Sequence, residues 1–220
     1  MAPPYSVIRR ERTDSTQDDA RAAFVDAPVL VVAAGQRKGR GRSASDWQTA
    51  PRAMAASLAL RPDWEATDLP LISLLAGVAA ARVVDCGLKW PNDVYRDGSK
   101  LGGILVEASD GVLVVGFGLN LWWPEAPAGV TAVHQEDPGP SAAGEIAERW
   151  ADELLALVAA GAAAWPREEY RARSITLGRQ ISWNPSGQGK AVDIAADGGL
   201  VVVTDGVRRT LHAGEVRHVR

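Results

Sequence analysis

The feature that most constrains this chain is a run of glycine and arginine that directly follows a stretch typical of a buried strand. Val29–Ala34 is continuously apolar and partly β-branched, which predicts a strand covered on both faces. Residues 35–42 then read GQRKGRGR and cannot form a regular element. Glycine lets the backbone approach an anion while arginine neutralises it, although the spacing matches neither the Walker nor the Rossmann pattern. The stretch therefore predicts either an anion-binding loop or an ordinary solvated basic loop.

A second candidate site is the segment Lys89–Asp93, which reads KWPND at the end of a predicted strand. It gathers a lysine, an amide and a carboxylate within one turn. Lys89 can hold a phosphate, Asn92 can orient a ligand, and Asp93 can bind Mg²⁺ or fix the lysine. The alternative is a plain turn, which is the usual setting of an Asn-Asp pair.

A third candidate is Lys100–Glu107, which reads KLGGILVE. The pattern predicts a strand with Lys100 at its mouth and with paired glycines, including Gly103, that leave room for a ligand against the backbone. A β-bulge packed by a neighbouring side chain, with the lysine in solvent, would explain the same pattern.

The remaining patterns predict an α+β chain with two domains, residues 1–174 and 175–220. Helices are expected over residues 14–26, 69–84, 141–164 and 165–173, and an antiparallel meander over 88–90, 101–107 and 112–119. Alanine content favours a helix over residues 53–60, but a strand remains open because this preference is weak. Residues 122–140 suit a surface loop. After residue 174, short β-branched pieces alternate with glycine turns, which indicates a small barrel of hairpins.

Composition excludes several classes of protein. The 220 residues are 46% hydrophobic, and one cysteine, Cys86, permits no intrachain disulfide. The net charge is −3 with both signs mixed, so no basic stripe indicates nucleic-acid binding. The first residues lack a signal-peptide pattern and no run is long enough to span a membrane. We expect a cytoplasmic protein without nucleic-acid or membrane partners, and the three histidines lack a metal-binding spacing.

The order of these motifs resembles that of the biotin protein ligases, a family related in fold to class II aminoacyl-tRNA synthetases. The matching pieces, in order, are DSTQ at 14–17, QRKGRGR at 36–42, Trp47, KWPND at 89–93, KLGGILVE at 100–107 and GFGLN at 116–120. Residues 175–220 are similar to the family's C-terminal SH3-like barrel. The resemblance implies a largely antiparallel sheet flanked by helices, followed by that barrel.

The resemblance also implies an activity and its site residues. The chain would form biotinoyl-AMP from biotin and ATP with Mg²⁺, and then pass biotin to a lysine of a biotin carboxyl carrier protein or carboxylase subunit. Catalysis would fall to Arg40, Arg42, Lys89 and Lys100. Biotin would contact Ser15, Thr16, Gln17, Gln36, Arg40, Gly41, Arg42, Lys100 and Gly103. The adenylate would contact Arg40, Arg42, Trp47, Lys89, Asn92, Lys100 and Asn120, and Asp93 is the candidate Mg²⁺ ligand.

Three departures from the family pattern concern the same site. Gln17 stands where asparagine is common, Ala44 and Ser45 replace a Gly-Arg pair, and an asparagine often found after Pro51 is absent. Loss of one charge-assisted contact would weaken retention of the adenylate by about 1.5 to 3 kcal/mol.

The resemblance leaves the partners and competing functions to be tested. Few residues precede the Ser-Thr motif, so we expect a short ligase without an N-terminal DNA-binding domain, and a homodimer is possible. Competing hypotheses are a lipoate or octanoate transferase of the same fold, a biotin sensor without adenylation, and an SH3-like interaction module. Biotin-dependent release of pyrophosphate from ATP, together with biotin and ATP binding, separates them.

Overall fold

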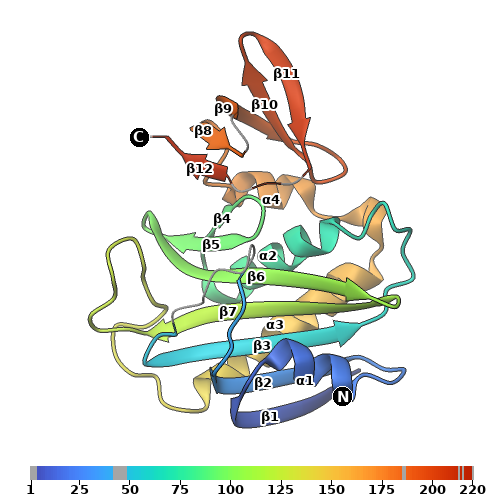
Figure 1. Ribbon diagram of the computed structural model, residues 1–220, viewed down its shortest axis with the longest axis vertical. Helices are drawn as coiled ribbons and strands as arrows, with labels where there is room; N and C mark the ends of the chain where they lie inside the picture. Colours follow the sequence, from blue (N-terminus) through green and yellow to red (C-terminus); the bar gives the residue numbers. More distant parts are fainter. Residues whose placement is uncertain (1–3, 42–48, 185–186, 213, 215, 220) are drawn as a thin grey trace.

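The computed structural model describes residues 4–41, 49–184, 187–212, 214 and 216–219. It contains two β-sheets and the helices that flank the larger one (Figure 1). The helices are α1 Thr16–Ala23, α2 Leu71–Val84, α3 Ala142–Ala159 and α4 Arg167–Arg173, with a 3₁₀ turn at Ala162–Ala164. The strands of the larger sheet are β1 Ser6–Thr13, β2 Val29–Gln36, β3 Arg52–Leu60, β4 Gly87–Lys89, β5 Asp93–Arg96, β6 Ser99–Ser109 and β7 Val112–Trp122.

The larger sheet has the order β1-β2-β3-β7-β6-β5-β4. Only β1 and β2 run parallel, and the other neighbours are antiparallel. The expected antiparallel meander is therefore confirmed, and the fold is the α+β class that the sequence predicts. Strands β1 and β5 were not predicted. Most side chains of β1 are exposed or half-buried, so this edge strand has no strict apolar alternation that a pattern could detect.

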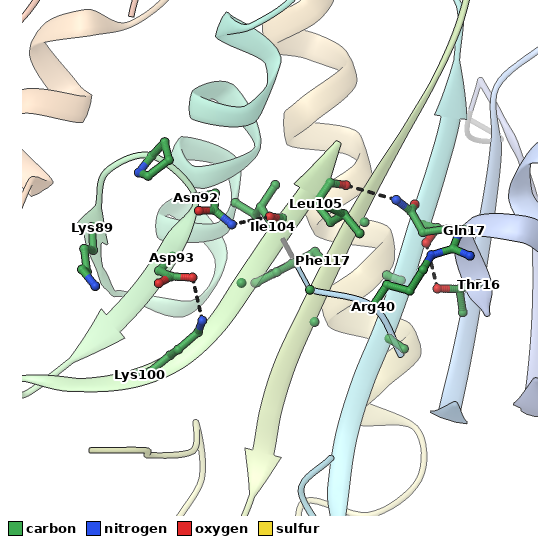
Figure 2. A pocket seen from close by; sticks show the side chains of 18 of the residues that line it. Thr16, Gln17, Arg40, Lys89, Asn92, Asp93, Lys100, Ile104, Leu105 and Phe117 are labelled. Carbon is green, nitrogen blue, oxygen red and sulfur yellow. Dashed lines mark hydrogen bonds and ion pairs between the residues drawn. The ribbon is translucent and has the colours of Figure 1, made fainter. Parts of the chain in front are cut away.

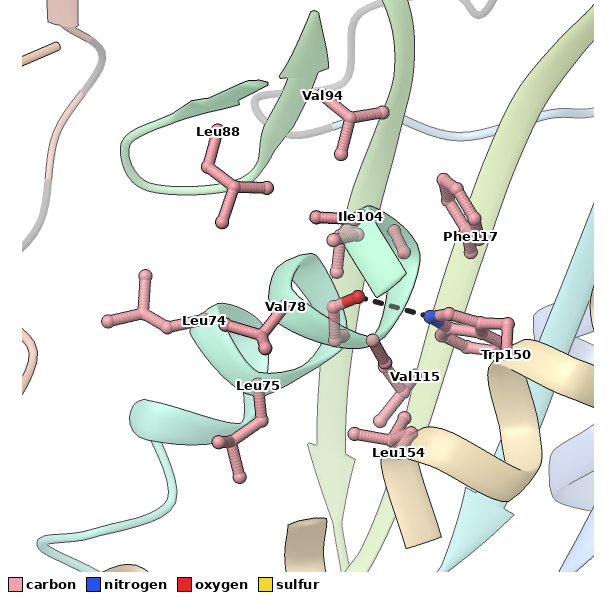
Figure 3. Close-up of a cluster of buried hydrophobic side chains, with 14 of the residues drawn as sticks. Leu74, Leu75, Val78, Leu88, Val94, Ile104, Val115, Phe117, Trp150 and Leu154 are labelled. Atoms are coloured by element: carbon pink, nitrogen blue, oxygen red, sulfur yellow. Dashed lines mark hydrogen bonds between the residues drawn. The ribbon is translucent and has the colours of Figure 1, made fainter. Parts of the chain in front are cut away.

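Helices cover both faces of this sheet. Helices α2 and α3 pack on one face, where Trp150 of α3 is fully buried and its ring lies 5.4 Å from that of Phe117 on β7 (Figure 3). The Trp150 indole Nε1 donates a 3.1 Å hydrogen bond to the Ala76 carbonyl of α2. Helix α1 covers the opposite face, where Ala20 packs with Val31 and Ala59. The sheet is thus buried on both sides at β2, β3 and β7.

Strand β3 settles the ambiguity over residues 53–60. Met54, Ala56 and Leu58 belong to the core beneath α2 and α3, while Ala59 packs toward α1. The strand lies between β2 and β7, so ladder hydrogen bonds on both sides outweigh the weak helical preference of alanine. Small side chains here let helices approach the sheet closely.

The second sheet has the order β11-β10-β9-β8-β12. Its strands are β8 Gln180–Trp183, β9 Gly187–Ile194, β10 Leu200–Thr204, β11 Val207–Leu211 and β12 Val216–His218. Among the described residues no pairing joins β11 to β12, so the sheet is open and the expectation of a closed barrel is corrected. The side chains of β11 are mostly exposed, which fits an edge strand without a second neighbour.

The two sheets share one hydrophobic core. Ile181 and Val202 of the second sheet belong to the same buried cluster as the side chains of α2. The Trp90 indole Nε1 donates a 3.0 Å hydrogen bond to the Gly198 carbonyl, and the Trp90 amide donates to Thr176 Oγ1. The end of β4 is therefore fixed against the second sheet, which places the KWPND segment at the junction.

Two further expectations concern Cys86 and membrane-spanning helices. Cys86 is buried, and burial raises the pKa of its thiol to about 11, which makes it unreactive at neutral pH. In the described part of the chain, no helix combines the length and apolar character needed to cross a membrane.

Candidate active site

A cavity of about 480 Å³ lies on the face of the larger sheet where α1 and residues 36–41 meet β3, β6 and β7. It runs along β6 from Lys100 to Leu105, a distance of about 17 Å for five strand residues. Pro91 belongs to its wall, as do Gly214 and Val216 from the end of the chain. Of the predicted site residues, those lining the cavity are Ser15, Thr16, Gln17, Gln36, Arg40, Gly41, Lys89, Asn92, Asp93, Lys100 and Gly103.

One end of the cavity is lined by neutral hydrogen-bonding groups. The backbone amide and the hydroxyl of Thr16 donate to Oε1 of Gln36 at 2.8 and 3.0 Å. The Thr16 hydroxyl also lies 2.8 Å from the hydroxyl of Ser57 on β3. Ser15 is likewise buried. Sequence reasoning did not single out Ser57, because a serine within an alanine-rich strand has no pattern of its own.

Gln17 adds an unsatisfied acceptor to this end. Its side chain is buried, and Nε2 donates to the carbonyls of Leu105 at 3.3 Å and Val114 at 3.5 Å. Oε1 has no hydrogen-bond partner among the described residues and lies against Gly116. A buried acceptor of this kind is normally satisfied, and a ligand N–H could reach this one once the side chain turns toward the cavity.

The other end of the cavity is cationic. Lys100 Nζ lies 2.7 Å from Oδ1 of Asp93, and Lys89 Nζ lies 5.4 Å from the centre of the Tyr95 ring. Asn92 fixes the KWPND segment to β6, because its side chain donates to the Ile104 carbonyl at 2.7 Å. Figure 2 shows the two lysines and Asp93 on the far side of Ile104 and Phe117 from Thr16 and Gln17.

The guanidinium of Arg40 does not lie at the cationic end. It contacts both carboxylate oxygens of Asp18 at 2.8 and 3.1 Å, and Oε2 of Glu107 at 3.2 Å. Glu107 is seven residues beyond Lys100 on β6, which corresponds to about 23 Å along the strand. The predicted convergence of Arg40 and Lys100 on one anion is therefore absent from this conformation. Asp18 and Glu107 were missed because only the fold brings them to the arginine.

Asp14 holds the start of the Gly/Arg segment. Its carboxylate lies 2.7 Å from Arg37 Nε and 3.1 Å from Lys38 Nζ, and hydrogen bonds from these two groups lower the pKa of Asp14. The Lys38 amide also donates to the Asp14 carbonyl at 2.9 Å. Two of the basic side chains of this segment are thus directed toward a carboxylate outside the cavity.

Three of the predicted nucleotide contacts, Asn120, Arg42 and Trp47, are not among the described residues that line the cavity. Asn120 is buried on β7 but is not part of the cavity wall. Its Nδ2 donates to the Thr131 carbonyl at 3.0 Å, and its Oδ1 has no partner among the described residues. Arg42 and Trp47 lie outside the described residues, as do Ala44 and Ser45.

Comparison with known proteins identifies the family. The sequence pattern of the Biotin/lipoate A/B protein ligase family matches residues 8–120, and that of the biotin protein ligase C-terminal domain matches residues 176–219. This chain belongs to the biotin/lipoate A/B protein ligase family. Together the two matches reach from β1 to the end of β12, so family membership covers both sheets.

Two relatives that align with nearly all of this chain carry the name of a biotin ligase. The biotin–[acetyl-CoA-carboxylase] ligase of Mycobacterium tuberculosis is 35% identical, with 95% of this chain and 87% of the relative aligned. The enzyme of the same name from Paracoccus denitrificans is 30% identical, over 93% of this chain and 97% of that relative. The biotin protein ligase of Aquifex aeolicus, solved with biotin and ATP, has the same fold, with a TM-score of 0.82 at 24% identity over 98% of this chain and 99% of that one.

Proposed function

We propose that this chain is a biotin protein ligase that joins biotin to AMP and transfers it to a lysine of a biotin carboxyl carrier protein. The observation that supports this most is the two-ended chemistry of the cavity. Biotin has a neutral ureido ring at one end and a carboxylate at the other. The cavity offers hydroxyl and amide groups at one end and two lysines at the other, with the paired glycines Gly103 and Gly118 between them.

The ureido ring fits the end that contains Thr16, Gln17 and Gln36. Ser15, Ser57 and the side-chain amides of Gln17 and Gln36 can accept hydrogen bonds from its two N–H groups and donate hydrogen bonds to its carbonyl oxygen. The Oε1 of Gln17 is closed to solvent in this structure, so its side chain must turn toward the cavity to join them. The valeryl chain then lies along β6 beside Gly103, where the absence of a side chain leaves room against the backbone.

The carboxylate of biotin then reaches Lys100, where the first step takes place. A carboxylate oxygen forms a bond to the α-phosphorus of ATP, the bond from that phosphorus to the β-phosphate oxygen breaks, and pyrophosphate leaves. Lys100 and Lys89 neutralise the negative charge that two approaching anions bring together. Lys100 must turn from Asp93 toward the phosphate, a movement that a long, half-buried lysine can make.

In the second step an acceptor lysine attacks the acyl carbon of the adenylate. The bond to the phosphate oxygen breaks, AMP leaves, and the amine loses a proton as the amide forms. Proximity in a closed site supplies most of the rate of such a step. Arg42 and Trp47 remain predicted contacts of the adenylate, and Asn120 remains a predicted contact on its nucleotide side.

The described residues offer Mg²⁺ one predicted ligand, Asp93, rather than a cluster of ligands. They contain no cluster of three histidine, cysteine, aspartate or glutamate side chains, and the carboxylate of Asp93 contacts Lys100. Mg²⁺ commonly enters such sites bound to the phosphates of the nucleotide, with few protein ligands. We therefore assign no step to a metal held by this chain.

The activity is tested by incubating the purified chain with ATP, biotin and a purified biotin carboxyl carrier domain, and by locating the modification by mass spectrometry. We expect biotin on one lysine of the carrier, dependent on ATP. Parallel reactions with lipoate and octanoate test the alternative acyl groups of the family. Transfer of lipoate or octanoate in place of biotin would contradict the proposal.

A further inference from the structure

The surroundings of Arg40 are electrostatically unsuited to an anion. Two carboxylates, Asp18 and Glu107, lie within 3.2 Å of its guanidinium, and hydrogen bonding to Asp18 raises the pKa of Arg40. These three side chains carry one positive and two negative charges, and the guanidinium of Arg21 lies 3.3 Å from the Glu107 carbonyl. A carboxylate or phosphate approaching the guanidinium of Arg40 would meet two like charges at close range.

The same contacts connect three separate parts of the chain. Arg40 belongs to the segment that leaves β2, Asp18 to the first turn of α1, and Glu107 to β6. Helix α1 already lies across β6, because Gln17 donates to the Leu105 carbonyl and Arg21 donates to the Glu107 carbonyl at 3.3 Å. The Arg40 side chain therefore fixes the Gly/Arg segment to a helix and a strand that are themselves joined.

This connection lies at the ring end of the cavity. Gln17, which lines that end, is the neighbour of Asp18, and Arg40 and Gly41 themselves form part of the wall. Figure 2 shows the Arg40 side chain beside Thr16 and Gln17 and remote from Lys100. A segment fixed here covers the site proposed for the ureido ring, whereas the anion would lie at the opposite end.

We infer that Arg40, Asp18 and Glu107 form a latch that holds residues 36–41 closed over the biotin ring, so that Arg40 is a positioning residue for biotin and Lys100 binds the anion. The inference rests on the proposed function for the identity of the ligand. The side chains of Arg40, Asp18 and Glu107 are 40%, 64% and 34% exposed. Exposed pairs contribute little each, so such a latch can open for biotin to enter and close behind it.

The latch predicts a specific kinetic pattern for Asp18→Asn and Arg40→Gln. Each substitution removes the paired contact between the Arg40 guanidinium and the two carboxylate oxygens of Asp18. Each should weaken biotin binding about three- to tenfold, mainly through faster dissociation. For Asp18→Asn, the KM for ATP and the kcat at saturating biotin should change less than twofold. Since both substitutions disrupt one interaction, the double variant should bind biotin no more weakly than the weaker single variant, within a factor of two.

Asp19→Asn is the matched control, because Asp19 also lies in the first turn of α1 but faces Arg10 at 3.8 Å. It removes the same charge from the same helix end and should leave biotin binding unchanged. A loss of biotin affinity equal to that of Asp18→Asn would show that the effect arises from the helix and would overturn the latch.

Two measurements on each protein decide the matter: calorimetric titration with biotin alone, and the KM for biotin and for ATP in pyrophosphate exchange. Non-additive loss of biotin affinity in the Asp18 and Arg40 variants supports the latch. A raised KM for ATP in Arg40→Gln with unchanged biotin affinity would show that Arg40 binds the anion, and additive losses would show that the pair does not act together. Biotin binding by the unmodified protein without exchange would refute the proposed ligase activity, while the calorimetric cycle would still decide the latch.

Discussion

Among single residues, Lys100 has the most direct role in the proposed chemistry. Replacing it with alanine removes the cation at the point where the biotin carboxylate meets the α-phosphate, and should lower the kcat of pyrophosphate exchange about 10²- to 10³-fold. Calorimetric binding of biotin alone should weaken far less, because the ring end is untouched. Lys190→Ala, on the exposed face of β9, serves as the control. A Lys100→Ala variant that retains full exchange would remove the lysine from the mechanism.

A substitution at Gly116 tests the end of the cavity that is proposed to bind the biotin ring. A Cβ atom there would lie 3.1 Å from Oε1 and 3.2 Å from Cδ of Gln17, which is close enough to displace that side chain toward the cavity. Gly116→Ala should weaken biotin binding about tenfold or more, with little change in thermal stability because the neighbour is a side chain that can move. Gly35→Ala, whose Cβ would meet nothing closer than 3.8 Å, should bind biotin normally. Equal affinities in the two variants would place biotin elsewhere.

The sequence could predict site residues only where they stand in a recognisable motif. The motifs at 14–17, 36–42, 89–93 and 100–107 lead to side chains that the fold assembles around one cavity. Ser57 lies there through register, because β3 pairs with β2 and β7 and so faces Thr16. The motif at 100–107 includes Glu107 but gives no sign of its contact with Arg40, which depends on α1 crossing β6. Contacts between residues 20 to 70 positions apart have no local pattern.

At the level of elements, α3 supports the sheet from behind the site. Trp150 is fully buried against Phe117, whose strand carries the cavity-lining Gly116 and Gly118. Trp150→Ala should reduce the free energy of unfolding by about 3 to 5 kcal/mol, because it leaves a large void in the core. Trp150→Phe should cost less, since it keeps most of the volume and loses the hydrogen bond to Ala76. Urea denaturation measures both, and equal stability of all three proteins would contradict this packing.

His218 on strand β12 makes the stability of the folded chain depend on pH. Burial, followed by the charges of Lys89 and Arg179, lowers the pKa of His218 below its usual 6.5. The folded protein therefore binds fewer protons here than the unfolded chain, so this contribution to stability is complete above pH 6.5 and is lost as pH falls below it. Urea unfolding between pH 7.5 and 5 should show a steeper decline than in His218→Gln. An identical decline in both proteins would refute the assignment.

The sequence predicted those helices and strands best in which buried apolar residues form a clear pattern. The predicted strand Val29–Ala34 and the predicted helix over residues 69–84 coincide with β2 and α2, in which residues 29–33 and most of Leu71–Val84 are buried. Strand β3 remained ambiguous because alanine suits both states, and β1, exposed along most of its length, was missed. The open second sheet also differs from the predicted barrel, because closure depends on pairing between strands far apart in the chain.

For the whole molecule, the shared core predicts that the two sheets unfold together. Trp90 donates a hydrogen bond to Gly198, and a Cβ atom on Gly198 would lie 2.7 and 2.9 Å from side chains of Leu74 and Leu71 on α2. Contact this close leaves the second sheet little independence. Urea transitions followed by tryptophan fluorescence and by far-ultraviolet circular dichroism should coincide. A separate early transition, assigned by hydrogen exchange to residues 176–219, would show two independent domains instead.

In the proposed function, one cavity binds biotin at its neutral end and activates it at its cationic end. Biotin-dependent exchange of labelled pyrophosphate into ATP tests this directly, because it requires formation of the adenylate and no acceptor protein. We expect exchange that depends on biotin in the unmodified chain. Biotin binding without exchange would contradict the claim and leave a protein that recognises biotin but does not activate it.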